Sequence, residues 1–247
     1  FKKNELKKKW GTMQKIFSSK DRLEKIVSDI IFDMNIEPRL ASGRGNAILV
    51  VGSIYQACRY YEIFQENNFK KCAVITSYDG SVNSIKGETV SPEEETEAEE
   101  KFEIYNKMLS DYDNIGIGKN DPEKFEKEVK EIFIETPNDM KLLIVVNKLL
   151  TGFDAPSASF LYLDKSLKDH GLFQAICRVN RLDGVDKEYG CIIDYKDLFH
   201  SIEHAVTDYT SDAFEGYDHD DVKGLLKNRI RAGRENLDTA INALQTL

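Results

Sequence analysis

The chain has 247 residues and a net charge of −9, and 41% of its residues are hydrophobic while 31% are charged, as in water-soluble globular proteins. No apolar run is long enough to span a bilayer, which excludes a membrane-embedded domain, and the acidic balance excludes a surface that binds nucleic acid throughout. The length corresponds to about one and a half domains of typical size, so we expect one large core with an appendage.

The first residues are basic. Residues 1–25 hold nine lysines and arginines against three acids, a net charge of +6. We expect residues 1–19 to form a basic lead-in helix or linker, either a solvated helix face or a surface that faces DNA. The start is lysine-rich and lacks the apolar core of a signal peptide. The chain begins at Phe1 and not at Met, so we expect it to be a piece of a longer protein. Residues 20–36 have apolar residues at helical spacing, and Pro38 ends that helix.

Two short apolar runs, 47–51 and 71–76, predict buried strands, and the helical pattern at 54–66 between them completes a βαβ unit. Ser53 precedes this helix and has the side chain of a typical N-cap. Tyr78 follows the second strand, where an aromatic ring can either stack on a base of a nucleic acid or pack on its own loop.

The stretch 80–140 is the least regular. Ser91-Pro92 followed by glutamates is typical of a helix start, because acids are favourable at the N-terminal end of a helix. Residues 88–103 hold eight glutamates against one lysine, which indicates a solvated surface segment. Asp121-Pro122 begins another amphipathic helix, which Pro137 ends.

The stretch 141–195 organises the chain. Apolar runs at 142–146, 160–163 and 191–193 are typical of strands buried on both faces of a parallel sheet. A turn, Thr151 to Pro156, lies between the first two and contains Gly152 and Asp154. We expect it at the carboxyl end of its strand, where α/β sheets commonly bind ligands.

The helix predicted between the last two strands carries Gln174, Arg178 and Arg181 at spacings i, i+4 and i+7, which places all three on one face. Two arginines presented together suit a phosphate group. Two arginines beside a phosphate and a short acid beside a ribose hydroxyl would together form a nucleotide site. Paired arginines on a solvated surface are the alternative for this element taken alone.

The order strand, TGFDAP, strand, QxxxRxxR, strand resembles motifs V and VI of the second motor lobe of superfamily-two helicases and translocases. Over about Ala47 to Phe199, the sequence looks most like the motor (R) subunit of type I restriction enzymes. The segments that carry this resemblance are LLTGFDAP, LYLDKSLKDHGLFQAICRVNR and YGCIIDYKDLF. The resemblance implies an α/β fold, with a RecA-like parallel sheet flanked by helices at 20–200 and a helical extension at 201–247.

The resemblance also implies roles for individual residues. Arg178 and Arg181 would be arginine fingers on the γ-phosphate of ATP, and Gln174 would sense the nucleotide or the attacking water. Gly152 would let the backbone approach the nucleotide, and Asp154 would contact the ribose. Thr151 would contact the DNA backbone, as would Ser53, and Tyr78 completes the expected DNA-binding set. Cys177 stands where many helicases carry glycine, and the site needs only a small residue there.

Two motifs of a self-sufficient NTPase are absent from the sequence. No GxxxxGK[ST] loop occurs, and no Asp-Glu pair is present to hold magnesium. The resemblance implies that both belong to an upstream first lobe, which would bind most of the ATP and Mg²⁺, with a nuclease domain further upstream. The chain alone would then be inactive. Its implied partners are duplex DNA and the methyltransferase and specificity subunits, in the cytoplasm of a prokaryote.

Other functions remain open at this stage. The chain could be the second lobe of another superfamily-two DNA or RNA helicase, or a non-enzymatic α/β interaction module. A small-molecule enzyme lacks support, because the sequence has no nucleophile elbow and no histidines with metal-ligand spacing. The four cysteines form no CxxC pair, so we expect no metal site and read them as free thiols in a reducing compartment.

Overall fold

A computed structural model describes residues 19–78, 80, 92–118, 121–149, 152–167, 169–184, 186–187, 189–196 and 241. The backbone divides into two compact units, Phe1–Phe199 and His200–Leu247. All the described residues except Ile241 belong to the first unit. The predicted lead-in at 1–19, apart from Ser19, and the extension at 201–247, apart from Ile241, lie outside the described residues and stay predictions.

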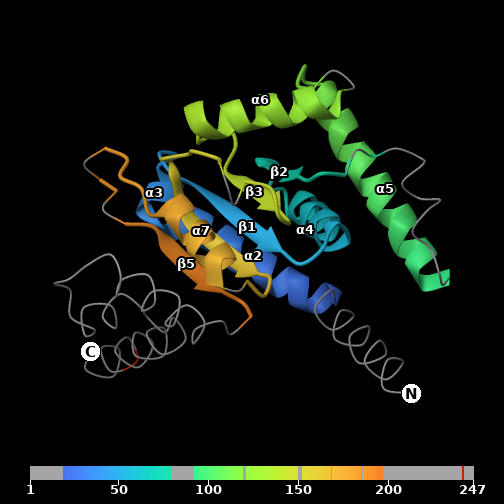
Figure 1. The fold of residues 1–247 in the computed structure, drawn as a ribbon, viewed down its shortest axis with the longest axis horizontal. Helices are drawn as coiled ribbons and strands as arrows, with labels where there is room; N and C mark the ends of the chain where they lie inside the picture. The colour runs from blue at the N-terminus through green and yellow to red at the C-terminus, as the bar shows by residue number, and fades with distance from the viewer. Residues whose placement is uncertain are drawn as a thin grey trace. The chain divides into compact units, whose positions relative to one another are not determined.

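The centre of the first unit is one sheet of five parallel strands in the order β2-β3-β1-β4-β5. Figure 1 shows the strands side by side between layers of helices. The predicted α/β class is therefore confirmed, and the arrangement is consistent with a RecA-like lobe. The strands are β1 (Asn46–Val51), β2 (Cys72–Ile75), β3 (Leu142–Val145), β4 (Ala158–Asp164) and β5 (Cys191–Asp194).

Helices cover both faces of the sheet. From β1 the chain crosses toward one edge to reach β2, and from β4 it crosses toward the other edge to reach β5. Because such crossovers are right-handed, the helices α4 and α7 that make them lie on opposite faces, with α2 beside α4 (Figure 1). The helices are α2 (Lys20–Ile36), α3 (Pro38–Ala41), α4 (Ile54–Glu66), α5 (Pro92–Asp113), α6 (Pro122–Glu135) and α7 (Asp169–Val179).

The strands differ in burial. Every residue of β1, β2, β3 and β4 is buried, as expected for strands covered on both faces. The four residues of β5 are only half-buried, so the prediction of full burial was wrong for this strand. The physical reason is its position, since β5 lies at the edge of the sheet and pairs only with β4.

Pro38 does not simply end a helix. Glu37 adopts an extended conformation, φ −71° and ψ 121°, because a residue before proline is disfavoured in the helical region. Pro38 then occupies the first position of the short helix α3, where its missing N–H is no loss. α3 brings Arg39 to the amino-terminal edge of the sheet.

A buried carboxylate holds α2 and α4 to the sheet. Asp164, the last residue of β4, is 0% exposed. It accepts two hydrogen bonds from Arg22 of α2, at 2.9 and 2.5 Å. It also accepts bonds from Gln56 at 2.5 Å and from the Tyr60 hydroxyl at 2.6 Å, both on α4. The Nζ of Lys196 lies 3.6 Å from the Oδ1 of Asp164.

This network stabilises the packing of four chain segments at the carboxyl edge of the sheet. Burial and the charge of Asp164 raise the pKa of Tyr60, so this hydroxyl remains a hydrogen-bond donor. Two further bonds tie α2 to the sheet, from Tyr162 to Asp33 at 3.0 Å and from Tyr195 to Asp29 at 2.6 Å. The position of α2 is therefore set by polar contacts as well as by its apolar face.

Candidate nucleotide site

α7 places two of the predicted site residues. Its apolar residues Leu172, Ala175 and Val179 are 0% exposed and recur at helical spacing, so they form the face that packs on the sheet. Gln174 and Arg178 lie at the remaining positions and are half-buried. Arg178 is in the last turn, where a cation is favoured by the partial negative charge of the helix end.

Arg181 lies beyond the end of α7, so the prediction that it shares a helical face with Gln174 and Arg178 was wrong. The helix ends at Val179. In a longer helix the Val179 carbonyl would accept a hydrogen bond from residue 183. Gly190 lies against this carbonyl instead. It is so close that a Cβ added to it would lie 2.3 Å from the Val179 oxygen. The close approach of this glycine ends the helix and lets the chain turn.

Both arginines contact the predicted ribose-binding turn. Arg178 Nη1 donates a hydrogen bond of 2.6 Å to the carbonyl oxygen of Phe153, and its Nε is buried without a hydrogen-bond partner. Arg181 forms an ion pair with Asp154. The side chains of this pair are 38% and 63% exposed, so they remain accessible from solvent. Residues 25 positions or more apart thus form one cluster.

The turn with Asp154 lies at the other edge of the sheet from the one predicted. Asn46, the first residue of β1, donates its backbone N–H to Ser157 at 3.2 Å, so this segment lies at the amino-terminal edge. The physical reason is the parallel direction of the strands. β3 and β4 both run parallel to β1, so their connection must return from the carboxyl end of β3 to the amino end of β4. Asp154 belongs to the end of this return.

The other predicted nucleotide contacts are placed as follows. Gly152 is exposed and has φ +71° with no atom within 4 Å of an added Cβ, so its backbone conformation, and not crowding, calls for glycine. Gln174 lies one helical turn before Arg178. Thr151 lies outside the part of the chain that the structure describes, and its expected contact stays a prediction.

A second set of polar residues supports the cluster from the side. Lys187, which is 2% exposed, donates hydrogen bonds to the carbonyl oxygens of Pro156 at 2.5 Å and Ala158 at 2.7 Å. Burial, with a smaller effect from the charge of Arg39, lowers the pKa of Lys187 to about 8. A neutral amine still has two N–H groups, so both bonds survive deprotonation.

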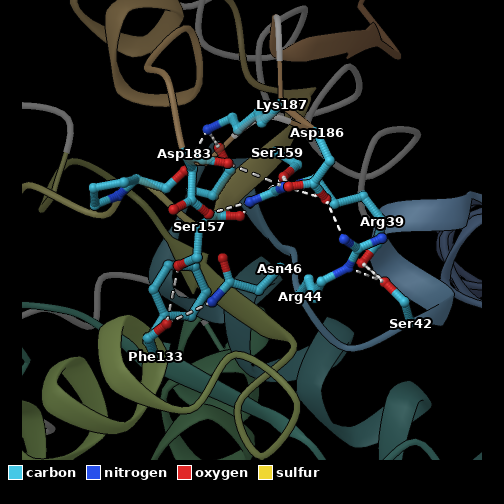
Figure 2. Close-up of polar contacts among 12 residues, drawn as sticks. Arg39, Ser42, Arg44, Asn46, Phe133, Ser157, Ser159, Asp183, Asp186 and Lys187 are labelled. Atoms are coloured by element: carbon cyan, nitrogen blue, oxygen red, sulfur yellow. Dashed lines mark hydrogen bonds and ion pairs between the residues drawn. The ribbon is translucent and has the colours of Figure 1, made fainter.

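Arg39 of α3 ties the chain after Arg181 to the sheet. Its guanidinium pairs with Asp183, lies 2.8 Å from Asp186, and donates a bond of 2.9 Å from Nε to Ser159 (Figure 2). Arg44 adds a second cation 2.9 Å from Asp186. Sequence reasoning missed these residues, because single charged residues in loops or in a four-residue helix give no periodic signal that separates a buried contact from a solvated one.

The two predicted DNA contacts that are described lie elsewhere. Ser53 and Tyr78 follow the carboxyl ends of β1 and β2, at the opposite edge from Asp154. The Ser53 hydroxyl accepts a 3.1 Å bond from the backbone N–H of Gln56, so it caps α4. Tyr78 is 8% exposed. Its ring meets Tyr105 edge-on at 5.2 Å and has the Lys101 amine 4.7 Å from its centre, so it packs on α5 and offers no open face to a base.

Variants of Ser53 separate capping from DNA contact. Ser53→Ala is expected to lower the free energy of unfolding by about 1 kcal/mol, because it leaves a helix N–H without its acceptor. Ser53→Asp keeps a capping oxygen and is expected to unfold like the wild type in urea. If Ser53 also faces DNA, the added negative charge lowers DNA affinity in a full-length protein. Unchanged affinity in both variants would restrict Ser53 to capping.

Comparison with known families gives a match that includes all five strands of the sheet. The model of type I restriction enzyme subunit R, domain 3, matches residues 43–197, which is more than half of the chain. The chain belongs to this family. The match includes Asp154, Arg178, Arg181 and Lys187, so the cluster lies within R-subunit domain 3.

Curated relatives of this R-subunit domain are type I restriction enzyme endonuclease subunits. The MjaIXP subunit of Methanocaldococcus jannaschii is 31% identical over 212 residues, 85% of the chain and 17% of that protein. The HindI subunit of Haemophilus influenzae is 40% identical over 106 residues, 42% of the chain and 10% of that protein. The SauCOLORF180P subunit of Staphylococcus aureus is 29% identical over 195 residues, 75% of the chain and 20% of that protein.

Among solved structures, a fragment of an HsdR subunit of a type I restriction enzyme from Vibrio vulnificus YJ016 matches with a TM-score of 0.49 and 17% identity. The match covers 83% of this chain and 32% of that one. The R-subunit domain described here spans a fifth or less of the length of these curated relatives. The activity of a whole subunit therefore remains a proposal for it.

Within the described residues, no helix is long and apolar enough to cross a membrane. The same part of the chain has no group of three or more His, Cys, Asp or Glu residues placed to hold a metal ion. All four cysteines are free thiols, and Cys58 and Cys72 are buried.

Proposed function

We propose that this domain is the second motor lobe of an ATP-dependent DNA translocase within a type I restriction endonuclease subunit. The observation that carries the proposal is the cluster of Arg178, Arg181 and Asp154 at one edge of the sheet, drawn from two segments far apart in the sequence. Family membership supports the same function, and it disfavours a helicase outside restriction systems.

The cluster fits a nucleotide held against an adjoining lobe. The two guanidinium groups supply fixed positive charge where negative charge grows on a transferring phosphoryl group. The Nε of Arg178 is buried and lacks an acceptor, so a phosphate oxygen would satisfy it only after the side chain reorients toward the nucleotide. Asp154 accepts hydrogen bonds from ribose hydroxyls in this proposal, and Gln174 lies close enough in sequence on α7 to face the same nucleotide.

The remaining components belong to other parts of a full-length subunit. An upstream lobe would supply the phosphate-binding loop and hold most of the ATP and the Mg²⁺, and a nuclease domain would cut the DNA. Thr151 and Ser53 are proposed to contact the DNA backbone, and we leave Tyr78 out because its ring is covered. Duplex DNA and the methyltransferase and specificity subunits are the proposed partners, in a prokaryotic cytoplasm.

Asp154→Ala tests the nucleotide site. In a full-length subunit, it is expected to raise the KM for ATP of DNA-stimulated hydrolysis roughly tenfold, because a hydrogen bond to a charged group contributes about 1.5 kcal/mol or more. Because Asp154 also pairs with Arg181, the variant frees that arginine as well, so kcat is expected to fall in addition to the rise in KM. The ion pair with Arg181 is largely exposed, so its loss has a small effect on stability.

Asp139→Ala, which removes an exposed acid outside the cluster, is the matched control and should leave KM unchanged. An unchanged KM in Asp154→Ala would remove the ribose contact from the proposal. A wild-type subunit without any DNA-stimulated ATP hydrolysis would overturn the translocase function itself and favour a non-enzymatic interaction module.

A further inference from the structure

Lys187 is the most buried lysine in the described part of the chain, at 2% exposure. Its amine makes no ion pair with an acid within the described residues, although burying an ammonium group without a paired charge costs free energy. Its described partners are two backbone carbonyl oxygens, those of Pro156 and Ala158. An apolar side chain of the same length would fill this space without that cost. The presence of a lysine here therefore calls for a role for its two hydrogen bonds.

The two carbonyls lie where the turn with Asp154 enters β4. The regular pairing of β1 with β4 is interrupted here, because Asn46 pairs with Ala158 while the next residue, Ala47, pairs with Phe160. A strand that starts with such an irregularity is not held in register by the ladder alone. The amine of Lys187 supplies two donors at this point and fixes the end of the turn.

Lys187 also makes a second connection between the two segments of the candidate site. It is six residues after Arg181 in the sequence, and its acceptor Pro156 is two residues after Asp154. The Arg181–Asp154 ion pair joins the two segments at one point, and the bond from Lys187 to Pro156 joins them at a second. Two connections between two short segments restrict the distance and orientation of the groups they carry.

Contacts of Arg39 hold the segment that carries Lys187 to the sheet. Arg39 pairs with Asp183 and Asp186, and it bonds Ser159 in β4 (Figure 2). The segment that carries Lys187 therefore cannot shift along the sheet without breaking these contacts. The contacts of Arg39 fix this segment relative to β4 without Lys187. The hydrogen bonds of Lys187 then hold the turn at a fixed distance from the segment.

We propose that Lys187 is a positioning residue for ATP hydrolysis, which sets the placement of Asp154 relative to Arg181 by holding the carbonyls of Pro156 and Ala158. The inference rests on the proposed function and deepens it. Lys187 touches neither the nucleotide nor the reacting atoms. It acts through the turn, and its effect is expected in the transition state, where the placement of an arginine finger matters most.

The test is DNA-stimulated ATP hydrolysis by a full-length subunit carrying Lys187→Met. This change keeps the length of the side chain and removes the donors. A shift of about 1 Å in a positioned group can reduce the rate about 10²-fold, so kcat is expected to fall between about tenfold and a hundredfold, with a much smaller change in the KM for ATP. Lys187→Arg, which retains donors, is expected to recover a substantial part of kcat.

Lys141→Met is the matched control. Lys141 is a half-buried lysine near the same edge, and its amine donates to the carbonyl of Leu40 at 2.7 Å, away from the turn. This variant should keep the wild-type kcat. If Lys187→Met lowers the melting temperature but leaves kcat per folded protein unchanged, the lysine is only structural and the inference is overturned.

If Lys187→Met does not fold, Lys187→Arg decides the question. A folded Lys187→Arg protein supports positioning if its kcat lies between those of the wild type and Lys187→Gln, with a near-normal KM, because it keeps the donors while its longer, planar group displaces the turn. A wild-type kcat together with equal catalysis by Lys187→Gln overturns it. Arg181→Ala is measured alongside. Should that variant hydrolyse ATP normally, the proposed function fails; should it be inactive while Lys187→Met is normal, only the present inference fails.

Discussion

Arg181→Ala in a full-length subunit is expected to reduce DNA-stimulated ATP hydrolysis by a factor of about 10³–10⁵, the range typical of an arginine finger. The guanidinium stabilises charge that develops only in the transition state, so kcat should fall while DNA affinity stays close to that of the wild type. Steady-state ATPase rates and DNA binding at one fixed salt concentration would be measured on the same preparations.

Arg181 is the cleaner of the two arginines to replace. Its described partner is Asp154, through an ion pair that is largely exposed, so its removal should hardly disturb the fold. Arg178 also holds the Phe153 carbonyl, and its loss would move the turn as well as the charge. Arg44→Ala serves as the control, because Arg44 is 63% exposed at the same edge and pairs with Asp186. Hydrolysis at the wild-type rate in Arg181→Ala would show that Arg181 has no catalytic role and would overturn the proposed function.

Asp164→Ala is expected to lower the free energy of unfolding by about 3–5 kcal/mol, as for other buried charge pairs that lose one partner. The change leaves the guanidinium of Arg22, the amide of Gln56 and the hydroxyl of Tyr60 without their common acceptor. A protein with ordinary marginal stability would lose a large fraction of its stability. Urea unfolding of the chain followed by circular dichroism would measure the difference.

Two further variants make this result specific. Asp139→Ala removes an exposed acid and is expected to stay within about 0.5 kcal/mol of the wild type. Asp164→Asn keeps the shape of the side chain but lacks the charge and brings an N–H group toward the donors. It should recover only a minor part of the loss. Full stability in Asp164→Asn would mean that packing, and not the charged acceptor, holds α2 and α4 to the sheet.

Local patterns in the sequence were sufficient to predict most elements. The expected helix at 54–66 coincides with α4, and the strands β1 to β4 lie within two residues of their predicted bounds at each end. These elements are strongly marked, because each buries a continuous apolar run or a helical stripe of apolar residues. The ends of α7 were less clear, since a helix end depends on what packs against it.

The errors have a common cause, which is dependence on distant residues. Arg181 fits the helical spacing, but the helix stops at Val179 because Gly190 lies against its last carbonyl. Asp154 follows a strand in the sequence, but it lies at the amino edge because β3 and β4 run parallel and the chain has already crossed back before β4 begins. Neither the packing of a remote glycine nor the point at which a connection crosses back along the sheet can be read from a local pattern.

The sequence by itself determined the α/β class, the run of strands and helices, and the two motifs that carry Asp154 and Arg178 with Arg181, because periodicity and turn residues are local properties of the chain. Only the tertiary structure decided which edge of the sheet these residues share, that Asp164 gathers α2 and α4, and that Lys187 holds the turn before β4. These are contacts between segments tens of residues apart, and their partners are selected by burial and strand order once the whole chain has packed.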